Sequence, residues 1–520
     1  MWLVEIMVKH IVIVGGGAAG WLTAGILAAE FHQSNERSVA VTLVESPDVN
    51  TIGVGEGTWP TMRTTLKKIG ISEAEFIKEC SASFKQGSKF VGWKTGAVDD
   101  VYYHPFTLPK SESGVNISAA WLDSYSNFAY GDAVCIQGRV CEKNLAPKQI
   151  TTPEYAGALN YGYHLDAGKF GVMLQSHCVA KLGVEHIVDH VGLVESGDDG
   201  SIAAVVTKKN GRIVGDLFVD CTGSRSVLLG KYLQVPFVDL RGESINDFAT
   251  AIQVPYLSDD AEIASATVAT AQSSGWTWDI GLSSRRGVGY VYSSSHISCD
   301  QAEVELRNYI AKSVGSSVAG ELSSKTIPIA AGHREIFWKK NCVAVGMAAG
   351  FIEPLEASAL ALVELSANMI RDELPMSSAA LEIVAERFNS IFRYRWQRIS
   401  EFLKLHYVLS ERRDTPYWRD VTDPERVPDS LKRLLELWKY RAPHYNDMLH
   451  VEEIFPAASY EYVLFGMGYH QSRIGRASDN VEAGKQLIAE TLRSSERYIA
   501  AMPSNRDLLA RISQFGLQKI

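Results

Sequence analysis

Three glycines near the start of the chain have the spacing that a bound pyrophosphate requires. Gly15, Gly17 and Gly20 form G-x-G-x-x-G directly after the β-branched run HIVIV and at the start of an Ala/Leu-rich segment that indicates a helix. The N–H groups and the dipole of a helix N-terminus favour a bound anion. Glu45 ends the next β-branched run, where its carboxylate can accept hydrogen bonds from a ribose diol. The pattern predicts a βαβ unit that binds a dinucleotide.

A second candidate is the stretch GWTWDIGL, which places Trp276 and Trp278 two residues apart. In an extended strand, residues i and i+2 point to the same face. These two rings and Ile280 would therefore form one apolar wall, with Thr277 and Asp279 on the other face. Such a wall could line a site, and a half-buried strand whose rings fill a core is the plain alternative. The pair by itself leaves both interpretations open.

The composition bounds the class of protein that can hold these residues. A chain of 520 residues exceeds the usual size of one compact core, and 46% hydrophobic with 21% charged residues is typical of a globular enzyme. A net charge of -9 without a long basic run argues against nucleic acid as the main partner. The seven cysteines are scattered and contain no C-x-x-C. We therefore expect no disulfide framework, no metal site and a reducing, cytoplasmic location.

The opening segment MWLVEIMVKHIVIV is interpreted as the first strand rather than as a signal sequence. Glu5, Lys9 and His10 break its apolar run, and Met7 is an alternative start. No apolar stretch of the sequence reaches the ~18 uninterrupted residues needed to cross a bilayer, so we expect no membrane partner.

The order of the patterns predicts the fold class. The βαβ unit indicates a Rossmann-like α/β module, followed to about Asn341 by short β-rich pieces mixed with short helices. From Ala348 onward the periodicity is helical. We predict that residues 1–375 form a dinucleotide-binding module with inserted elements, and that residues 376–520 form a helical module packed on it.

Two later segments favour FAD over NAD as the dinucleotide. LFVDCTGSRSVL (217–228) and NCVAVGMAAGFIEPL (341–355) each indicate a strand that runs into a turn of small residues. They are similar to the further cofactor-contact segments of FAD proteins in the glutathione-reductase-like class. The alternative interpretation is that each segment is an ordinary strand followed by a turn, without contact to a cofactor.

With these segments in place, the sequence resembles the flavin-dependent tryptophan halogenases. The W-x-W-x-I-P signature of that family is matched through Ile280 and departs from it at Gly281, where the proline is missing. The resemblance covers nearly the whole chain, in the segments GGGAAGW, GVGEGTWP, SFKQGSKFVGW, YHPF, GFIEPLEAS and KLHYVLSERRDTPYW.

The resemblance implies bromination or chlorination of an electron-rich aromatic substrate. In the family, FADH2 from a separate NAD(P)H-dependent flavin reductase reacts with O2, halide is oxidised to hypohalous acid, and this oxidant travels through a tunnel to the substrate. The paired tryptophans keep the substrate away from the flavin. The cofactor-binding residues so implied are Gly15, Gly17, Ala18, Ala19, Gly20, Glu45, Gly55, Gly57, Asp220, Gly223, Gly346 and Phe351.

Lys85, in SFKQGSKF, is the lysine that the resemblance assigns to catalysis. It would hydrogen-bond hypohalous acid or form a haloamine, and so aim one electrophilic halogen at one carbon. An amine that is buried beside an apolar tunnel is accessible in its uncharged form. A surface lysine on a helix is the alternative, and Lys89 could share that helix face.

Glu356, in PLEAS, is the acid that the resemblance assigns to catalysis. It would stabilise the cationic ring intermediate or take its proton. Glu353 is the near competitor, but the order Pro354-Leu355-Glu356 matches the family's P-L-E. We therefore expect a turn or capping role for Glu353.

The segment after this glutamate departs from the family, because Ala357, Ser358 and Ala359 replace the usual S-T-G. In the family the last two of these positions supply backbone N–H groups to halide. An alanine in place of the glycine would restrict that backbone if it needs a positive φ. We predict halide binding at Ser358 and Ala359, with chloride penalised more than bromide.

The same resemblance predicts the residues that line the substrate pocket and tunnel, namely Trp276, Trp278, His104, Phe106 and Pro354. A lone histidine is as readily a structural residue. The region EEIFPAASYEYVLFGMGY (452–469) does not clearly reproduce the residues with which tryptophan-specific members hold the amino-acid group. We therefore expect an indole in place of free tryptophan.

Two other functions compete with halogenation. A flavin-dependent aromatic hydroxylase shares the FAD module and an aromatic pocket, but the paired tryptophans and the pair of Lys85 and Glu356 speak against it. A flavin-binding sensor is the non-enzymatic alternative, and buried catalytic groups are costly unless they are used. The oligomeric state is left open, with a homodimer as one outcome.

Overall fold

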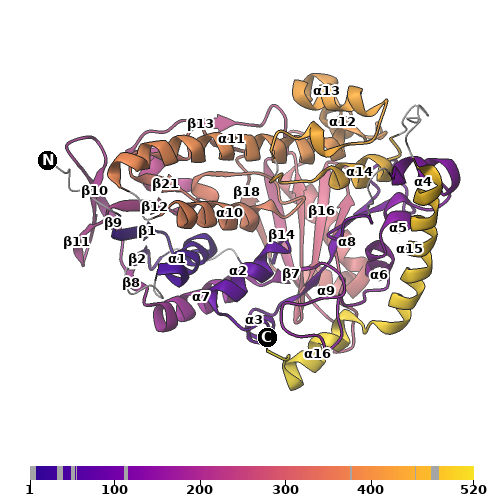
Figure 1. The fold of residues 1–520 in the computed structure, drawn as a ribbon, viewed down its shortest axis with the longest axis horizontal. Coiled ribbons are helices and arrows are strands. Elements are labelled where there is room, and N and C mark those ends of the chain that lie inside the picture. The colour runs from indigo at the N-terminus through magenta and orange to yellow at the C-terminus, as the bar shows by residue number, and fades with distance from the viewer. Residues whose placement is uncertain are drawn as a thin grey trace. The chain divides into compact units, whose positions relative to one another are not determined.

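The computed structural model describes residues 8–31, 39–48, 53, 55–110, 115–374, 377–450, 452–469 and 480–519 (Figure 1). The expectation for residues 1–7, which includes Met7, lies outside the described residues. The chain forms two compact units of three segments each. Unit 1 is Met1–Ser81, Leu165–Leu240 and Ala330–Trp396, and unit 2 is Ala82–His164, Arg241–Ile329 and Gln397–Ile520.

This division differs from the boundary predicted between residues 375 and 376. Unit 1 continues to Trp396, and the two insertions 82–164 and 241–329 belong with the C-terminal helices to unit 2. The physical reason is strand pairing. Strand β5 (Gly87–Val91) from the first insertion lies parallel to β15 (Thr267–Ala271) from the second, so both insertions share one sheet.

Unit 1 is built on the predicted βαβ unit, formed by β1 (His10–Val14), α1 (Ala18–Phe31) and β2 (Ala40–Glu45). The central sheet has the order β20-β21-β12-β1-β2-β8, in which β20 alone is antiparallel to its neighbour. Its Val/Ile-rich strands are buried, as expected for a parallel sheet with helices on its faces. The sheet is completed by β20 (Trp338–Lys339), β21 (Cys342–Ala344), β12 (Leu217–Asp220) and β8 (Glu185–Val188).

Two glycines of the G-x-G-x-x-G motif are required by close backbone approaches. Gly15 has a φ of +117°, and a Cβ there would lie 2.2 Å from the carbonyl oxygen of Cys221. A Cβ on Gly20 would lie 1.9 Å from the carbonyl oxygen of Gly15. These contacts press the start of α1 against the sheet, and this is the packing role of the first and third glycines.

The remaining elements of unit 1 surround this sheet. Helix α1 packs against α7 (Ala167–Leu182) and α10 (Ser358–Glu373). The others are β3 (Glu56–Gly57), α2 (Thr61–Ile69), α3 (Glu73–Glu79), β9 (Val191–Ser196), β10 (Ile202–Thr207), β11 (Gly211–Val214), β13 (Phe237–Asp239), β19 (Gly332–Arg334) and β22 (Gly350–Phe351).

Unit 2 contains a seven-stranded sheet in the order β18-β14-β17-β16-β15-β5-β6. All neighbours are antiparallel except β15 and β5. Helix α8 (Cys299–Val314) covers part of one face with the apolar stripe Ala302, Leu306, Ile310 and Val314. The other strands are β18 (Ser324–Pro328), β14 (Phe248–Pro255), β17 (Arg285–Tyr292), β16 (Gly275–Gly281) and β6 (Val101–Pro105).

The helical periodicity predicted from Ala348 onward is confirmed by a series of helices. In chain order they are α10, α11 (Ser378–Val408), α12 (Pro416–Val421), α13 (Asp429–Trp438), α14 (Ala457–Gly466), α15 (Val481–Ala501) and α16 (Asn505–Phe515). Earlier elements of unit 2 are the strand pair β4 (Ser83–Lys85) and β7 (Gly162–Leu165), and the helices α4 (Ile117–Ser124), α5 (Tyr130–Val134), α6 (Gln137–Glu142) and α9 (Ser316–Glu321).

Among the described residues, no helix combines the length and apolar character that a membrane crossing requires. The same residues contain no cluster of three or more His, Cys, Asp or Glu side chains placed to hold a metal ion. All seven cysteines are free thiols.

Candidate active site

A cavity of about 430 Å³ in unit 1 joins the glycine-rich turn to the segment around Pro354. It is lined by the turn 15–19 and by Glu45, and also by Pro354, Ser358 and Ala359. The predicted dinucleotide turn and the predicted halide residues therefore face one space. Gly223, Gly346 and Phe351 also line this cavity.

The glycine turn that lines the cavity has the features that FAD requires. A Cβ on Gly17 would meet no atom within 4 Å, so this backbone is open to an approaching pyrophosphate. Beside it begins the 14-residue helix α1, whose first N–H groups favour an anion. The indole N–H of Trp21 donates to the Glu45 carboxylate at 3.1 Å, and the imidazole Nε2 of His186 lies 3.4 Å from it. The residues present thus fit a dinucleotide cofactor.

Four of the residues predicted to bind cofactor lie outside the lining of this cavity, namely Gly20, Gly55, Gly57 and Asp220. Asp220 is buried and shapes the adjoining turn, because its carboxylate accepts hydrogen bonds from Thr222 and from the N–H groups of Leu228 and Leu229. That turn carries Gly223 to the cavity. Direct contact of these four residues with FAD stays a prediction.

The turn that carries Glu356 is strained at Ala357. This residue adopts the left-handed conformation, with φ 53° and ψ 42°, immediately before α10. The family pattern predicts a restricted backbone at Ala359 on the condition that this residue needs a positive φ. The positive φ lies instead at Ala357, and Ser358 and Ala359 are the first two residues of the helix. Their N–H groups are therefore among those that a helix leaves without intrahelical partners.

Lys85 is buried in unit 2, with 1% of its surface exposed. It ends the strand β4, which pairs with β7, so the alternative of a helix is wrong for both Lys85 and Lys89. The Lys85 ammonium nitrogen lies 5.3 Å from the centroid of the Phe106 ring. Burial, and secondarily the charge of Lys85, hold the pKa of His164 well below its usual range.

Lys89 has a different environment. It lies on β5, its side chain is 23% exposed, and its ammonium group pairs with Glu142 at 2.8 Å. The same carboxylate also accepts a hydrogen bond from the Tyr103 hydroxyl. Lys89 is thus a half-buried ion-pair partner, and Lys85 is the buried amine of the two.

The structure places Trp276 and Trp278 on one face of β16, a strand whose seven residues are all buried. Their rings lie edge to face with centroids 6.4 Å apart. The Trp278 ring spreads over Gly289 of β17, where an added Cβ would lie 2.2 Å from it. Asp279 points the other way, and the hydroxyl of Tyr309 on α8 donates to its carboxylate at 3.2 Å. The strand is therefore buried on both faces, and a tunnel-lining role for the pair stays a prediction.

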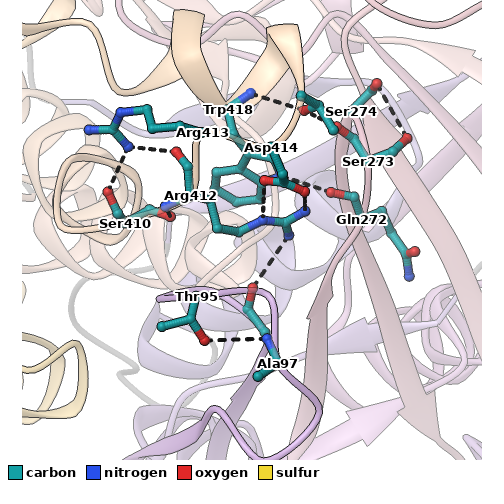
Figure 2. Close-up of polar contacts among 12 residues, drawn as sticks. Thr95, Ala97, Gln272, Ser273, Ser274, Ser410, Arg412, Arg413, Asp414 and Trp418 are labelled. Carbon is teal, nitrogen blue, oxygen red and sulfur yellow. Dashed lines mark hydrogen bonds and ion pairs between the residues drawn. The ribbon is translucent and has the colours of Figure 1, made fainter.

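Two further tryptophans of unit 2 extend the aromatic cluster that contains this pair. Trp93 lies 6.3 Å from the first ring of the pair and 5.9 Å from Trp418. Trp418 donates its indole N–H to the Gln272 carbonyl at 2.8 Å, and the Arg412 guanidinium lies 4.3 Å from its ring centroid. Asp414 holds that guanidinium through hydrogen bonds of 2.8 and 3.1 Å (Figure 2). The segments that contain these residues carried the family resemblance, but the sequence assigned the residues themselves no role.

His104 lies on β6 among aromatic rings of unit 2. Its imidazole Nε2 is 2.9 Å from the Ser459 hydroxyl, and its ring lies 5.5 Å from Phe402 and 6.4 Å from Phe455. Phe106 follows on the same segment and is half-buried beside the catalytic candidate Lys85. Both interpretations of His104, as a pocket residue and as a structural one, are compatible with this setting.

Comparison with known proteins decides the family. The model of the tryptophan halogenase family matches residues 10–483. The chain belongs to the tryptophan halogenase family. It is 34% identical to the tryptophan 6-halogenase SttH of Streptomyces toxytricini, covering 95% of this chain and 98% of that protein. It is 31% identical to the tryptophan 7-halogenase RebH of Lentzea aerocolonigenes, over 83% and 82% of the two chains.

A solved structure gives the same result. The tryptophan halogenase from Shewanella frigidimarina is 45% identical, covers 99% of both chains and superposes with a TM-score of 0.95. The predicted fold class, an FAD-binding Rossmann-like module, is therefore confirmed, and this halogenase is an FADH2- and halide-dependent enzyme rather than an aromatic hydroxylase. When bound, reduced FAD supplies the electrons with which O2 is activated to oxidise halide.

One buried acid of the halogenase near the cavity predicts a pH effect on stability. Glu364 on α10 accepts hydrogen bonds from the hydroxyls of Thr61 and Thr65, and burial raises its pKa to about 7. Between its ordinary value and 7 the folded state binds a proton that the unfolded state releases, so this carboxyl lowers stability as pH rises through that window.

Glu364→Gln removes this penalty and keeps a hydrogen-bonding amide. The quantity compared is the unfolding free energy of the variant minus that of the native chain. We expect this difference to be larger at pH 8 than at pH 4.5 by on the order of 3 kcal/mol. Urea unfolding at both pH values measures the difference. A difference that does not change with pH would show that Glu364 titrates normally.

Proposed function

We propose that this halogenase transfers an electrophilic halogen to an indole-type ring, with Lys85 directing hypohalous acid and Glu356 taking the ring proton. The observation that supports the first role most strongly is the burial of Lys85 against the Phe106 ring. A buried amine can hold a neutral hypohalous acid by one hydrogen bond, or accept its halogen to form a haloamine. In either form the halogen is presented from a fixed point.

Glu356 is proposed as the acid because its position on the turn is fixed and its side chain is 97% removed from solvent. A buried carboxylate is suited to stabilise a cationic ring and to remove its proton. Glu353 is buried on the same segment, and the competing proposal is that Glu353 is the acid and Glu356 only shapes the turn.

Glu356→Gln keeps the size of the side chain and removes its charge. We expect the rate of halogenation to fall by a factor on the order of 10²–10⁴, with FAD binding unchanged. Glu353→Gln is the matched control, and it should keep most of the activity if it folds normally. A loss of less than about threefold in Glu356→Gln would leave this residue only a structural role.

The halide is proposed to meet the N–H groups of Ser358 and Ala359 at the start of α10. Ala357 precedes them and has no side-chain oxygen with which to cap the helix, so these donors are open to an anion. A donor pair that departs from the family's S-T-G segment is less well aimed at halide, and this penalises chloride most because chloride is more strongly hydrated and harder to oxidise. We therefore propose bromide as the preferred halide.

The substrate is proposed to lack an amino-acid group. In unit 2 three polar side chains of α14 have internal partners: Ser459 contacts His104, Glu461 accepts from Tyr130, and Tyr462 donates to the carbonyl of Thr107. A zwitterion buried without partners of its own has a large desolvation cost. An indole without an amino-acid group avoids this cost.

FADH2 is proposed to come from a separate NAD(P)H-dependent flavin reductase.

Competition experiments test halide and substrate together. With chloride and bromide at equal concentration we expect mainly bromoindole, and with indole and tryptophan at equal concentration we expect indole to react first, at its most electron-rich carbon. Liquid chromatography with mass spectrometry measures the products. A single chlorotryptophan isomer halogenated on the benzo ring would contradict both halves of the proposal.

A further inference from the structure

Trp59 is bound directly to the turn that carries Glu356. Its indole N–H donates to the backbone carbonyl of Glu356 at 2.8 Å, across 297 positions of the sequence. Both residues belong to unit 1. This carbonyl is part of the peptide bond that joins Glu356 to Ala357, so the hydrogen bond fixes the orientation of that peptide plane.

The peptide needs such a restraint because the next residue is strained. Ala357 is in the left-handed region, which disfavours a residue with a Cβ and persists only where neighbours hold it. Within the turn, the Ala357 N–H donates to the Pro354 carbonyl at 3.2 Å. If φ of Ala357 relaxed to a negative value, the segment that carries the Glu356 carboxylate would turn relative to the first N–H groups of α10.

Trp59 is itself held in place by the helix that the turn introduces. It lies two residues before α2, and Thr61 and Thr65 of α2 both donate to Glu364 on α10. Glu364 is 2% exposed, so this link is shielded from water. Helix α10 is therefore linked to α2 through Glu364, and the chain just before α2 is linked back to Glu356 through the Trp59 indole.

We propose that Trp59 is a positioning residue for halogenation, which holds the Glu356 peptide so that the carboxylate and the N–H groups of Ser358 and Ala359 keep their direction. This role rests on the functions proposed for Glu356 and the halide residues. It assigns to Trp59 no contact with substrate.

Trp59→Phe tests the role because it keeps an aromatic ring and removes the N–H. We expect FAD affinity to stay unchanged and the halide KM to rise by roughly three- to tenfold. We also expect a lower ratio of halogenated product formed to FADH2 oxidised. Trp338→Phe is the matched control, since Trp338 also donates its indole N–H to a backbone carbonyl of unit 1, that of Lys340 at 3.0 Å. It should leave the halide KM unchanged.

A second substitution separates peptide positioning from a general packing effect. Glycine adopts the left-handed conformation without strain, so Ala357→Gly in the Trp59→Phe background should return the halide KM to within about twofold of the native value. A halide KM that is unchanged in Trp59→Phe, equally raised in Trp338→Phe, or not restored by Ala357→Gly would overturn the proposal. Glu356→Gln measured in parallel distinguishes this failure from failure of the proposed function, because it acts on the carboxylate alone.

Discussion

Lys85→Ala is expected to abolish halogenated product while FAD still binds and FADH2 is still oxidised by O2. The amine is buried in unit 2, whereas the cavity that fits FAD is formed by residues of unit 1, so the substitution removes no cofactor contact of that cavity. Without the amine, hypohalous acid is not directed to the substrate. Product should fall by a factor on the order of 10³ or more, with flavin oxidation within about twofold of the native rate.

Lys89→Ala is the matched control for this result. Lys89 lies four residues away, and its substitution removes a partly exposed ion pair with Glu142 and a cation–π contact with Tyr103, both of small energy. The two rates to be measured are product formation by mass spectrometry and FADH2 oxidation by absorbance under O2. Near-native product from Lys85→Ala, with loss in Lys89→Ala, would move the catalytic role to the second lysine.

Gly17→Val is expected to abolish FAD binding without unfolding the chain. A Cβ at this position meets no protein atom within 4 Å, so the valine side chain has room and occupies the space that the pyrophosphate needs. We expect FAD affinity to fall by at least about 100-fold, measured by quenching of flavin fluorescence, with an unchanged circular dichroism spectrum. A yellow, fully loaded variant would contradict the cofactor site.

Gly20→Val provides the contrast, because its Cβ would lie 1.9 Å from the Gly15 carbonyl oxygen. This substitution should destabilise the start of α1 and lower the yield of folded protein. The two glycines therefore separate a cofactor effect from a packing effect within one motif.

The features predicted well from the sequence are those fixed by local patterns. The βαβ unit is indicated by a β-branched run, a glycine turn and an Ala/Leu-rich segment, each visible within 36 residues between His10 and Glu45. The helical periodicity after Ala348 is equally local. The family resemblance assigns Lys85 and Glu356 through the short motifs that contain them, and the structure shows both to be buried.

The features that sequence reasoning missed depend on partners far apart in the chain. The strand at Lys85 has three residues and no alternation of its own, and it is defined by pairing with β7 nearly 80 positions later. The segments of the two units alternate along the sequence because β5 of the first insertion pairs with β15 of the second. The family pattern raises the question of a positive φ only at Ala359. Helix α10 begins at Ser358, so Ala359 is helical and the positive φ lies at Ala357, just before the helix.

The most direct test of the central claim is the mass of the product formed by the native chain from indole, with FAD, NADH, a flavin reductase, O2 and bromide. Replacement of one hydrogen by bromine, seen as the paired isotope peaks of that element and lost when either bromide or reductase is omitted, is the predicted result. A product that gains oxygen instead, with bromide present throughout, would contradict it.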